Sequence, residues 1–171
     1  MPSLLAITPA ILFAALMLTA GARDALSFRI PNWISLAIVA LFPVAALASG
    51  LSWAGVGLHL GVGGLALAAG LAMFALRWVG GGDAKLFAAA ALWLGWPAVV
   101  TFLAAAAFAG GALAVVLIGM RSTVLRPLVL MGPRWVARLA EPGEGVPYGV
   151  AIAIGALFAL QGSPLAAGLE L

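Results

Sequence analysis

The fold is decided by residues 84–120, which read AKLFAAAALWLGWPAVVTFLAAAAFAGGALAVVLIGM. A membrane-spanning helix takes about 20 apolar residues, so this run is too long for a single span. The GWP at residues 95–97 divides it, because proline lacks the N–H that a helix needs and disfavours helix at the residue before it. The run therefore predicts a short helix over residues 84–94 and a full span over residues 98–120. A short helix is tolerated where its start lies in a hydrated, protein-lined cavity.

Similar apolar runs occupy most of the remaining chain. Of its 171 residues, 65% are hydrophobic and only 8% are charged, too few to cover the surface of a soluble domain. We therefore expect one all-α, polytopic membrane domain over residues 1–171, with about six transmembrane helices. The first run lacks the basic n-region of a signal peptide, so it is interpreted as a retained span. The predicted spans are residues 4–22, 33–49, 54–76, 84–94, 98–120 and 147–169, with a loop at residues 121–145.

The basic residues predict the orientation of the spans. All eight Lys and Arg side chains fall on alternate connections: after the first span, between the third and fourth, and between the fifth and sixth. The positive-inside rule places these connections in the cytoplasm, so both termini are expected on the non-cytoplasmic side. The formal charge of +3 is too small to indicate nucleic-acid binding, and we expect the loop arginines to contact anionic lipid headgroups.

Two of the five acidic residues lie at the edges of apolar spans. Asp24 follows the first span and Asp83 precedes the short one, and the predicted topology puts both at the cytoplasmic edge of the bilayer. Two carboxylates close together share a proton, because both do not ionise cheaply. One then acts as a base towards water and the other donates a proton to the carbonyl or leaving group. The pair predicts peptide-bond hydrolysis without a metal or cofactor. The absence of cysteine excludes disulfides, thiolate chemistry and a Cys-based zinc site.

The three glycines before Asp83 fit such a site. Without Cβ atoms, Gly80, Gly81 and Gly82 allow another backbone to approach, allow unusual φ/ψ values and allow the loop to move. In the third span, Gly57 and Gly61 have the spacing that lets helices pack closely.

Simpler interpretations stay open for each of these polar residues. Asp83 is also a candidate N-cap of the helix that follows, and capping does not exclude catalysis. Asp24 is also a candidate partner of Arg23 or Arg29 at the headgroups. Lys85 is interpreted as a topology marker or counter-charge. The lone histidine, His59, is expected to be a packed or pore-facing residue, while Tyr148 and the six tryptophans fit an aromatic belt.

Three motifs together resemble the type IV prepilin peptidase family. GGGD at residues 80–83, followed by Lys85 and Leu86, fits the GxGD motif of aspartic proteases of this kind. DALSFRIPN, which begins at Asp24 and ends in Pro31-Asn32, is similar to the family's first aspartate motif. VPYGVAIAIGAL, with Gly149 and Gly155, resembles its last span.

This resemblance implies an aspartic endopeptidase of the bacterial inner membrane whose active site faces the cytoplasm. It would cut the short basic leader from prepilins or pseudopilins, usually after a glycine, with Asp24 and Asp83 as the catalytic pair. The motif does not decide which of the two is base and which is acid. The residues that the resemblance implies for substrate binding or loop flexibility are Gly80, Gly81, Gly82, Lys85, Pro31 and Asn32. Pilus or secretion components are further partners that it suggests.

The chain departs from the longer family members in one respect. Those members carry a cytoplasmic domain with paired CxxC motifs and also methylate the new N-terminus, whereas this chain has no cysteine. Peptidase activity without N-methylation is therefore expected. The chain resembles the short branch that serves tight-adherence (Flp-type) pili, and the archaeal preflagellin peptidases are also short.

Two other functions use the same residues. A proton- or cation-coupled transporter subunit would carry its ions on Asp24 and Asp83, as intramembrane acids often do. A non-catalytic scaffold of a secretion assembly would use the Gly/Ala faces to bind partners and would tolerate the loss of both carboxylates. The prepilin cleaved, the cleavage position, the oligomeric state and the role of the loop at residues 121–145 do not follow from the sequence.

Overall fold

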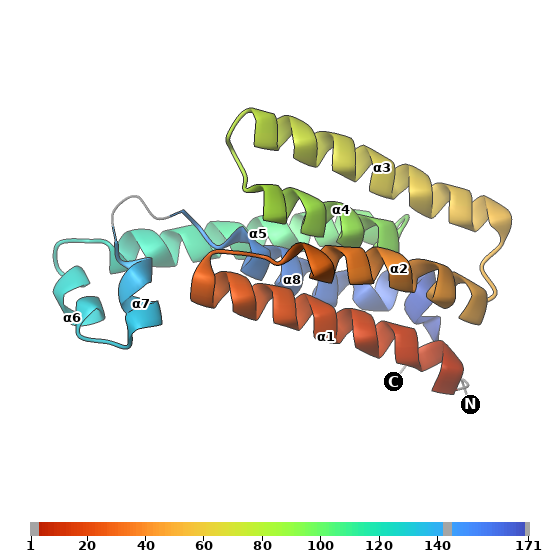
Figure 1. The fold of residues 1–171 in the computed structure, drawn as a ribbon, viewed down its shortest axis with the longest axis horizontal. Coiled ribbons are helices and arrows are strands. Elements are labelled where there is room, and N and C mark those ends of the chain that lie inside the picture. The colour runs from red at the N-terminus through yellow and green to blue at the C-terminus, as the bar shows by residue number, and fades with distance from the viewer. Residues whose placement is uncertain (1–3, 142–144, 170–171) are drawn as a thin grey trace.

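The computed structural model describes residues 4–141 and 145–169, which form an all-helical bundle (Figure 1). The expected all-α class is confirmed. Two 3₁₀ segments, Leu160–Gly162 and Pro164–Leu169, follow the last α-helix. The α-helices are α1 (Leu4–Ser27), α2 (Asn32–Ala48), α3 (Trp53–Ala75), α4 (Gly81–Leu94), α5 (Ala98–Met120), α6 (Arg126–Leu130), α7 (Arg134–Leu139) and α8 (Tyr148–Ala159).

Several of these helices are suited to a bilayer. Three segments are long and apolar enough to cross a membrane: Ile7–Ser27, Trp53–Ala75 and Ala98–Met120. Two shorter apolar helical segments, Asn32–Ala48 and Tyr148–Gly162, accompany them. Large hydrophobic side chains such as Leu65, Phe108 and Phe158 are exposed on the outside of the bundle, as expected of a surface that faces lipid chains. The chain is a multi-pass membrane protein.

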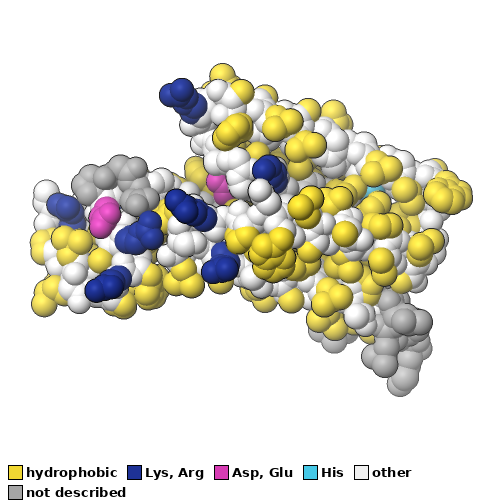
Figure 2. Space-filling view, in the orientation of Figure 1, with side chains coloured by type: hydrophobic (Ala, Val, Ile, Leu, Met, Phe, Trp, Pro, Cys, Tyr) yellow, Lys and Arg dark blue, Asp and Glu magenta, His cyan; other side chains and the backbone are white. Residues whose placement is uncertain are grey.

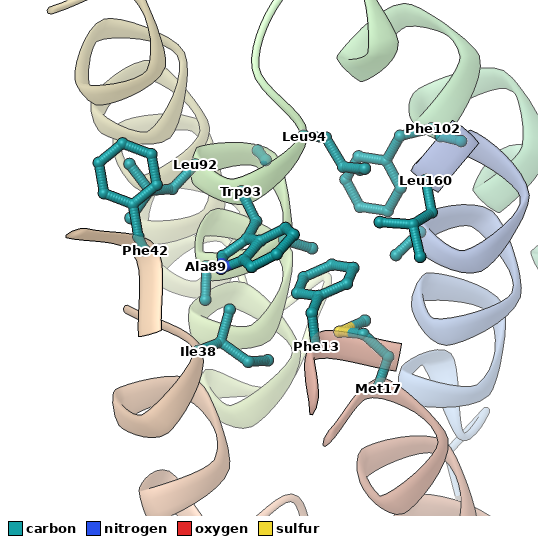
Figure 3. Packing of buried hydrophobic residues seen from close by; sticks show 14 of the residues in the cluster. Phe13, Met17, Ile38, Phe42, Ala89, Leu92, Trp93, Leu94, Phe102 and Leu160 are labelled. Carbon is teal, nitrogen blue, oxygen red and sulfur yellow. The ribbon is translucent and has the colours of Figure 1, made fainter. Parts of the chain in front are cut away.

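The short helix α4 lies at the centre of the bundle. Helices α2, α3, α5 and α8 all pack against it, and nearly all its side chains beyond the first turn are buried. Trp93 is fully buried and stacks on Phe13 of α1, with ring centroids 4.5 Å apart (Figure 3). The expectation that all tryptophans line the membrane surface is therefore wrong for Trp93, because protein rather than lipid surrounds α4.

The predicted break between α4 and α5 is confirmed. Helix α4 ends at Leu94 and α5 begins at Ala98, with Gly95 between them at a φ of 64°. Glycine is required there twice over, since a Cβ at residue 95 would also collide with the ring of His59. His59 is 1% exposed, and its Nδ1 donates a 2.8 Å hydrogen bond to the Leu92 carbonyl. Of the two expectations for His59, a packed residue or a pore-facing one, the first is confirmed.

Three boundaries differ from the sequence prediction. The last span, predicted over residues 147–169, is α-helical only over Tyr148–Ala159, and two 3₁₀ segments follow it. Helix α1 runs to Ser27 instead of ending near residue 22, and it stops only where Phe28 adopts a φ of 53°. The residues after Ala22 are good helix formers, so a prediction based on hydropathy alone ended the helix too early. The predicted loop at residues 121–145 also contains the short helices α6 and α7, whose few residues give no clear periodic pattern.

Charge is concentrated at one end of the molecule. In Figure 2 the Lys and Arg side chains gather over the end that carries the α3–α4 connection and helices α6 and α7, whereas hydrophobic side chains cover the rest of that face. Arg121 fastens the α6–α7 segment by donating hydrogen bonds to the carbonyls of Leu139 (2.9 Å) and Gly145 (3.0 Å). Arg138 adds a contact to the α1–α2 connection, with its guanidinium 5.7 Å from the centroid of the Phe28 ring.

Candidate active site

Asp24 is a buried carboxylate in the last two turns of α1. It is 5% exposed, and its Oδ2 accepts a 2.7 Å hydrogen bond from the backbone N–H of Gly149 at the start of α8. A bond from an N–H to a charged group is worth about 1.5–3 kcal/mol. Among the described residues no salt bridge joins Asp24 to Arg23 or Arg29, so the interpretation of Asp24 as a headgroup ion pair is wrong.

Asp83 occupies the third position of α4 rather than its N-cap. The cap residue is Gly80, and the Asp83 Oδ2 accepts a 3.2 Å hydrogen bond from the Gly80 N–H. This is the carboxylate half of a capping box, since glycine has no side chain to complete the other half. The Oδ1 atom of Asp83 is buried and has no hydrogen-bond partner among the described residues. One oxygen therefore holds the helix start, while the other is available for chemistry.

The fold brings the two aspartates to one pocket. An open pocket of about 480 Å³ lies between the α1–α2 connection and the start of α4, and both Asp24 and Asp83 line it. Their charges interact electrostatically, although 58 residues lie between them in the chain. Burial raises the pKa of the Asp83 carboxyl above its ordinary value, and the N–H groups of Gly80 and Gly149 oppose that rise.

The glycines at the site serve close packing. A Cβ on Gly82 would lie 3.2 Å from the Cβ of Ile30, and one on Gly149 would lie 2.9 Å from the Asp24 Oδ2. Gly81 and Gly82 form the first turn of α4 and are not part of a loop, and none of the three predicted glycines has a positive φ. The expectation of unusual φ/ψ values at these positions is therefore wrong, whereas close backbone approach is observed.

The remaining predicted residues lie beside the aspartates. Pro31 and Asn32 line the same pocket, and Asn32 begins α2. The Lys85 ammonium group donates a 3.1 Å hydrogen bond to the Asn32 Oδ1, which links the first turn of α4 to the first turn of α2. All eight residues selected from the sequence thus lie at one end of the bundle.

Two residues at the site were not assigned to it from the sequence. Gly149 holds Asp24 through its backbone N–H, and Tyr148 lines a second open pocket of about 610 Å³ together with Asp83, Gly80 and Trp78. Both belong to the VPYG stretch, and Gly149 in particular gave no indication of a role at the site because its contribution comes through the backbone. Asp83 therefore lies between two pockets, one shared with Asp24 and one shared with Tyr148.

This arrangement suits general acid–base chemistry on a bound peptide. Two carboxylates whose charges interact divide one proton between them, so one accepts a proton while the other donates one. Among the described residues, no three His, Cys, Asp or Glu side chains are placed to hold a metal ion.

A comparison with protein-family models finds a match that covers most of the helical bundle. Residues 11–115, more than half of the chain, match the model of the type IV leader peptidase family. The matched segment contains both aspartates, the three glycines and the Lys85–Asn32 pair. No curated protein and no solved structure matches the chain.

Proposed function

Because the chain belongs to the type IV leader peptidase family, we propose that Asp24 and Asp83 are the pair with which it cleaves the leader from type IV or Flp-type prepilins. Family membership makes the chain an aspartic-type leader peptidase. The proposal adds the two residues, the prepilin class, hydrolysis by an activated water, and the absence of N-methylation. The observation that carries it is the pocket shared by the buried Asp24 and the half-buried Asp83, whose charges interact.

The reaction follows from the two carboxylates. The ionised member removes a proton from a water molecule, whose oxygen attacks the scissile carbonyl carbon, while the protonated member donates its proton to the carbonyl oxygen. As the tetrahedral intermediate collapses and its C–N bond breaks, the first carboxyl gives its proton to the departing amine nitrogen. The second carboxylate takes back a proton from a hydroxyl of the intermediate, which becomes the new carboxyl group, so the pair returns to its starting state. General acid–base steps of this kind contribute about 10²–10⁴-fold each.

The position of the site supports a cut at the cytoplasmic boundary. The basic side chains gather at the end of the bundle that carries the aspartates, and the positive-inside rule places such an end in the cytoplasm. A basic leader then stays in the cytoplasm while the apolar segment behind it lies in the bilayer. The scissile bond falls between the two, at the depth of Asp24 and Asp83.

Leader cleavage by the purified protein tests the assignment. We expect Asp24→Asn and Asp83→Asn each to lower cleavage of a prepilin by at least about 10²-fold, since each removes one partner of the acid–base pair. Glu141→Gln is the matched control, because Glu141 is an acid in the α7–α8 connection that does not line either pocket. The control is expected to retain wild-type cleavage.

The same variants separate the alternatives. Cleavage that survives in either aspartate variant, with normal membrane insertion, would contradict the assignment of the pair. A transporter subunit would instead show ion flux that depends on membrane potential and ignores the leader peptide. A scaffold would keep its function in both variants.

A further inference from the structure

A third open pocket, distinct from the two that Asp83 lines, lies along the outside of the bundle. Helices α2 and α3 both pack on α4, which lies between them in Figure 1, and a groove of about 500 Å³ remains with α4 as its floor. Its walls are almost entirely apolar. They include Ser35, Leu36 and Val39 of α2 and Leu60, Gly64 and Leu67 of α3.

The groove adjoins the catalytic pocket. Asn32 lines both, and Lys85, which lines the groove, donates a hydrogen bond to the Asn32 side chain. From Lys85 the groove follows α4 as far as Leu92, a rise of about 10 Å or roughly two helical turns. Its polar end therefore touches the candidate active site, and its apolar length extends away from the charged end of the molecule.

The groove also contains a polar group without a partner. Ser35 is 6% exposed and lines the groove, and its hydroxyl makes no hydrogen bond within the part of the chain that the structure describes. The α4 side chains project little into the groove, because Ala88 and Ala89 carry only methyl groups there. Small residues let a second helix backbone approach closely, and a buried hydroxyl can bond across such an interface.

We propose that this groove holds the first turns of the substrate's apolar helix, directly after the scissile bond. The inference rests on the proposed function, because a prepilin carries its apolar segment immediately behind the leader. A peptide whose scissile bond lies between Asp24 and Asp83 leaves the catalytic pocket past Asn32 and enters the groove at Lys85. The groove thereby sets which bond reaches the aspartates.

A glycine in the wall gives a direct test. A Cβ on Gly64 meets no atom within 4 Å, so Gly64→Leu places a side chain in the groove without a clash at its Cβ. Gly61→Leu is the matched control: Gly61 lies on the same helix, is equally open, and does not line the groove. Two substrates are compared, a full-length prepilin and a soluble peptide that contains the leader and cleavage site but no apolar helix.

We expect Gly64→Leu to lower kcat/KM for the full-length prepilin, mainly through KM, by about tenfold more than for the soluble peptide, which corresponds to about 1.4 kcal/mol of lost binding. Gly61→Leu is expected to leave both values at the wild-type level. Equal effects of Gly64→Leu on the two substrates, or no effect on either, would overturn the docking site. Failure of the wild-type protein to cleave either substrate would instead overturn the proposed function.

Cross-linking provides a second measurement that does not depend on turnover. Because the chain has no cysteine, single cysteines report one position each. In an Asp83→Asn background, Leu67→Cys in the groove is expected to cross-link to a cysteine in the first turns of the substrate helix. Leu65→Cys, which is 75% exposed on the same helix and outside the groove, is expected not to. Equal cross-linking at both positions would contradict the proposal, as would a lipid chain in the groove that excludes the substrate.

Discussion

At the residue scale, a backbone N–H fixes the position of the first aspartate. Gly149 donates to the Asp24 Oδ2 at 2.7 Å, and its Cα lies against the Asp24 side chain, so the residue cannot carry a Cβ without movement. The donor comes from α8 and the acceptor from α1, two elements at opposite ends of the sequence. The geometry of Asp24 therefore depends on the packing of the last α-helix.

Substitution of Gly149 by alanine should impair catalysis while the protein stays folded. An added Cβ would lie 2.7 Å from the Ile30 Cδ1 and 2.9 Å from the Asp24 Oδ2, so Asp24 must shift. A displacement of about 1 Å in a catalytic group costs on the order of 10²-fold in rate. Leader cleavage by Gly149→Ala measures the loss, with Gly111→Ala as the control, since a Cβ at Gly111 meets nothing within 4 Å. Full activity in Gly149→Ala would show that the contact does not position Asp24.

The candidate site was largely predictable at this scale, and what was missed has a physical reason. Carboxylates are rare in an apolar chain, so Asp24 and Asp83 were identified as candidates by composition and position alone. The contribution of Gly149 could not be predicted, because it is made by a backbone N–H, which every residue except proline carries. That Asp83 uses one oxygen to hold the Gly80 N–H depends on where α4 begins, which hydropathy does not resolve.

At the element scale, glycines set the distances between helices. A Cβ on Gly155 of α8 would lie 2.7 Å from the backbone nitrogen of Ala106 in α5, and one on Gly63 of α3 would lie 3.1 Å from the Cα of Leu92 in α4. The spacing of Gly57 and Gly61 predicted a close approach that does not occur, since a Cβ added at either residue would meet no neighbouring atom within 4 Å. The glycine spacing alone did not reveal which face of α3 packs on α4.

The α5–α8 contact should not tolerate a larger side chain. Gly155→Leu forces the two helices apart, because the atoms it would meet belong to the α5 backbone and to a methyl group that cannot rotate away. We expect a loss of about 1–3 kcal/mol in the free energy of unfolding, together with reduced cleavage, because α8 also carries Gly149. Thermal unfolding in detergent measures the first effect. Gly111→Leu, on the outer side of α5, should change neither, and equal stability of the two variants would contradict the packing argument.

At the scale of the whole molecule, the fold follows from where apolar runs end. The GWP break separated α4 from α5 in the sequence, and the structure has the same division. The central place of α4 was not predictable, because its run of alanines and leucines looks the same whether lipid or protein surrounds it. Its 14 residues are compatible with a membrane protein because the other helices enclose it and its start opens on the catalytic pocket.

The six crossings and their orientation stay a prediction, which cysteine labelling can test. The chain has no cysteine, so Trp78→Cys, Thr123→Cys, Ser49→Cys and Trp96→Cys each introduce a single thiol at an exposed connection. A membrane-impermeant maleimide added to intact cells should label residues 49 and 96 but not 78 and 123, which should react only after the membrane is opened. Residues 78 and 123 lie at the charged end that carries both aspartates, where the positive-inside rule predicts the cytoplasm. Labelling of residues 78 and 123 from opposite sides would separate Asp83 from the α5–α8 connection and would rule out the arrangement in which Gly149 and Asp83 meet at one site.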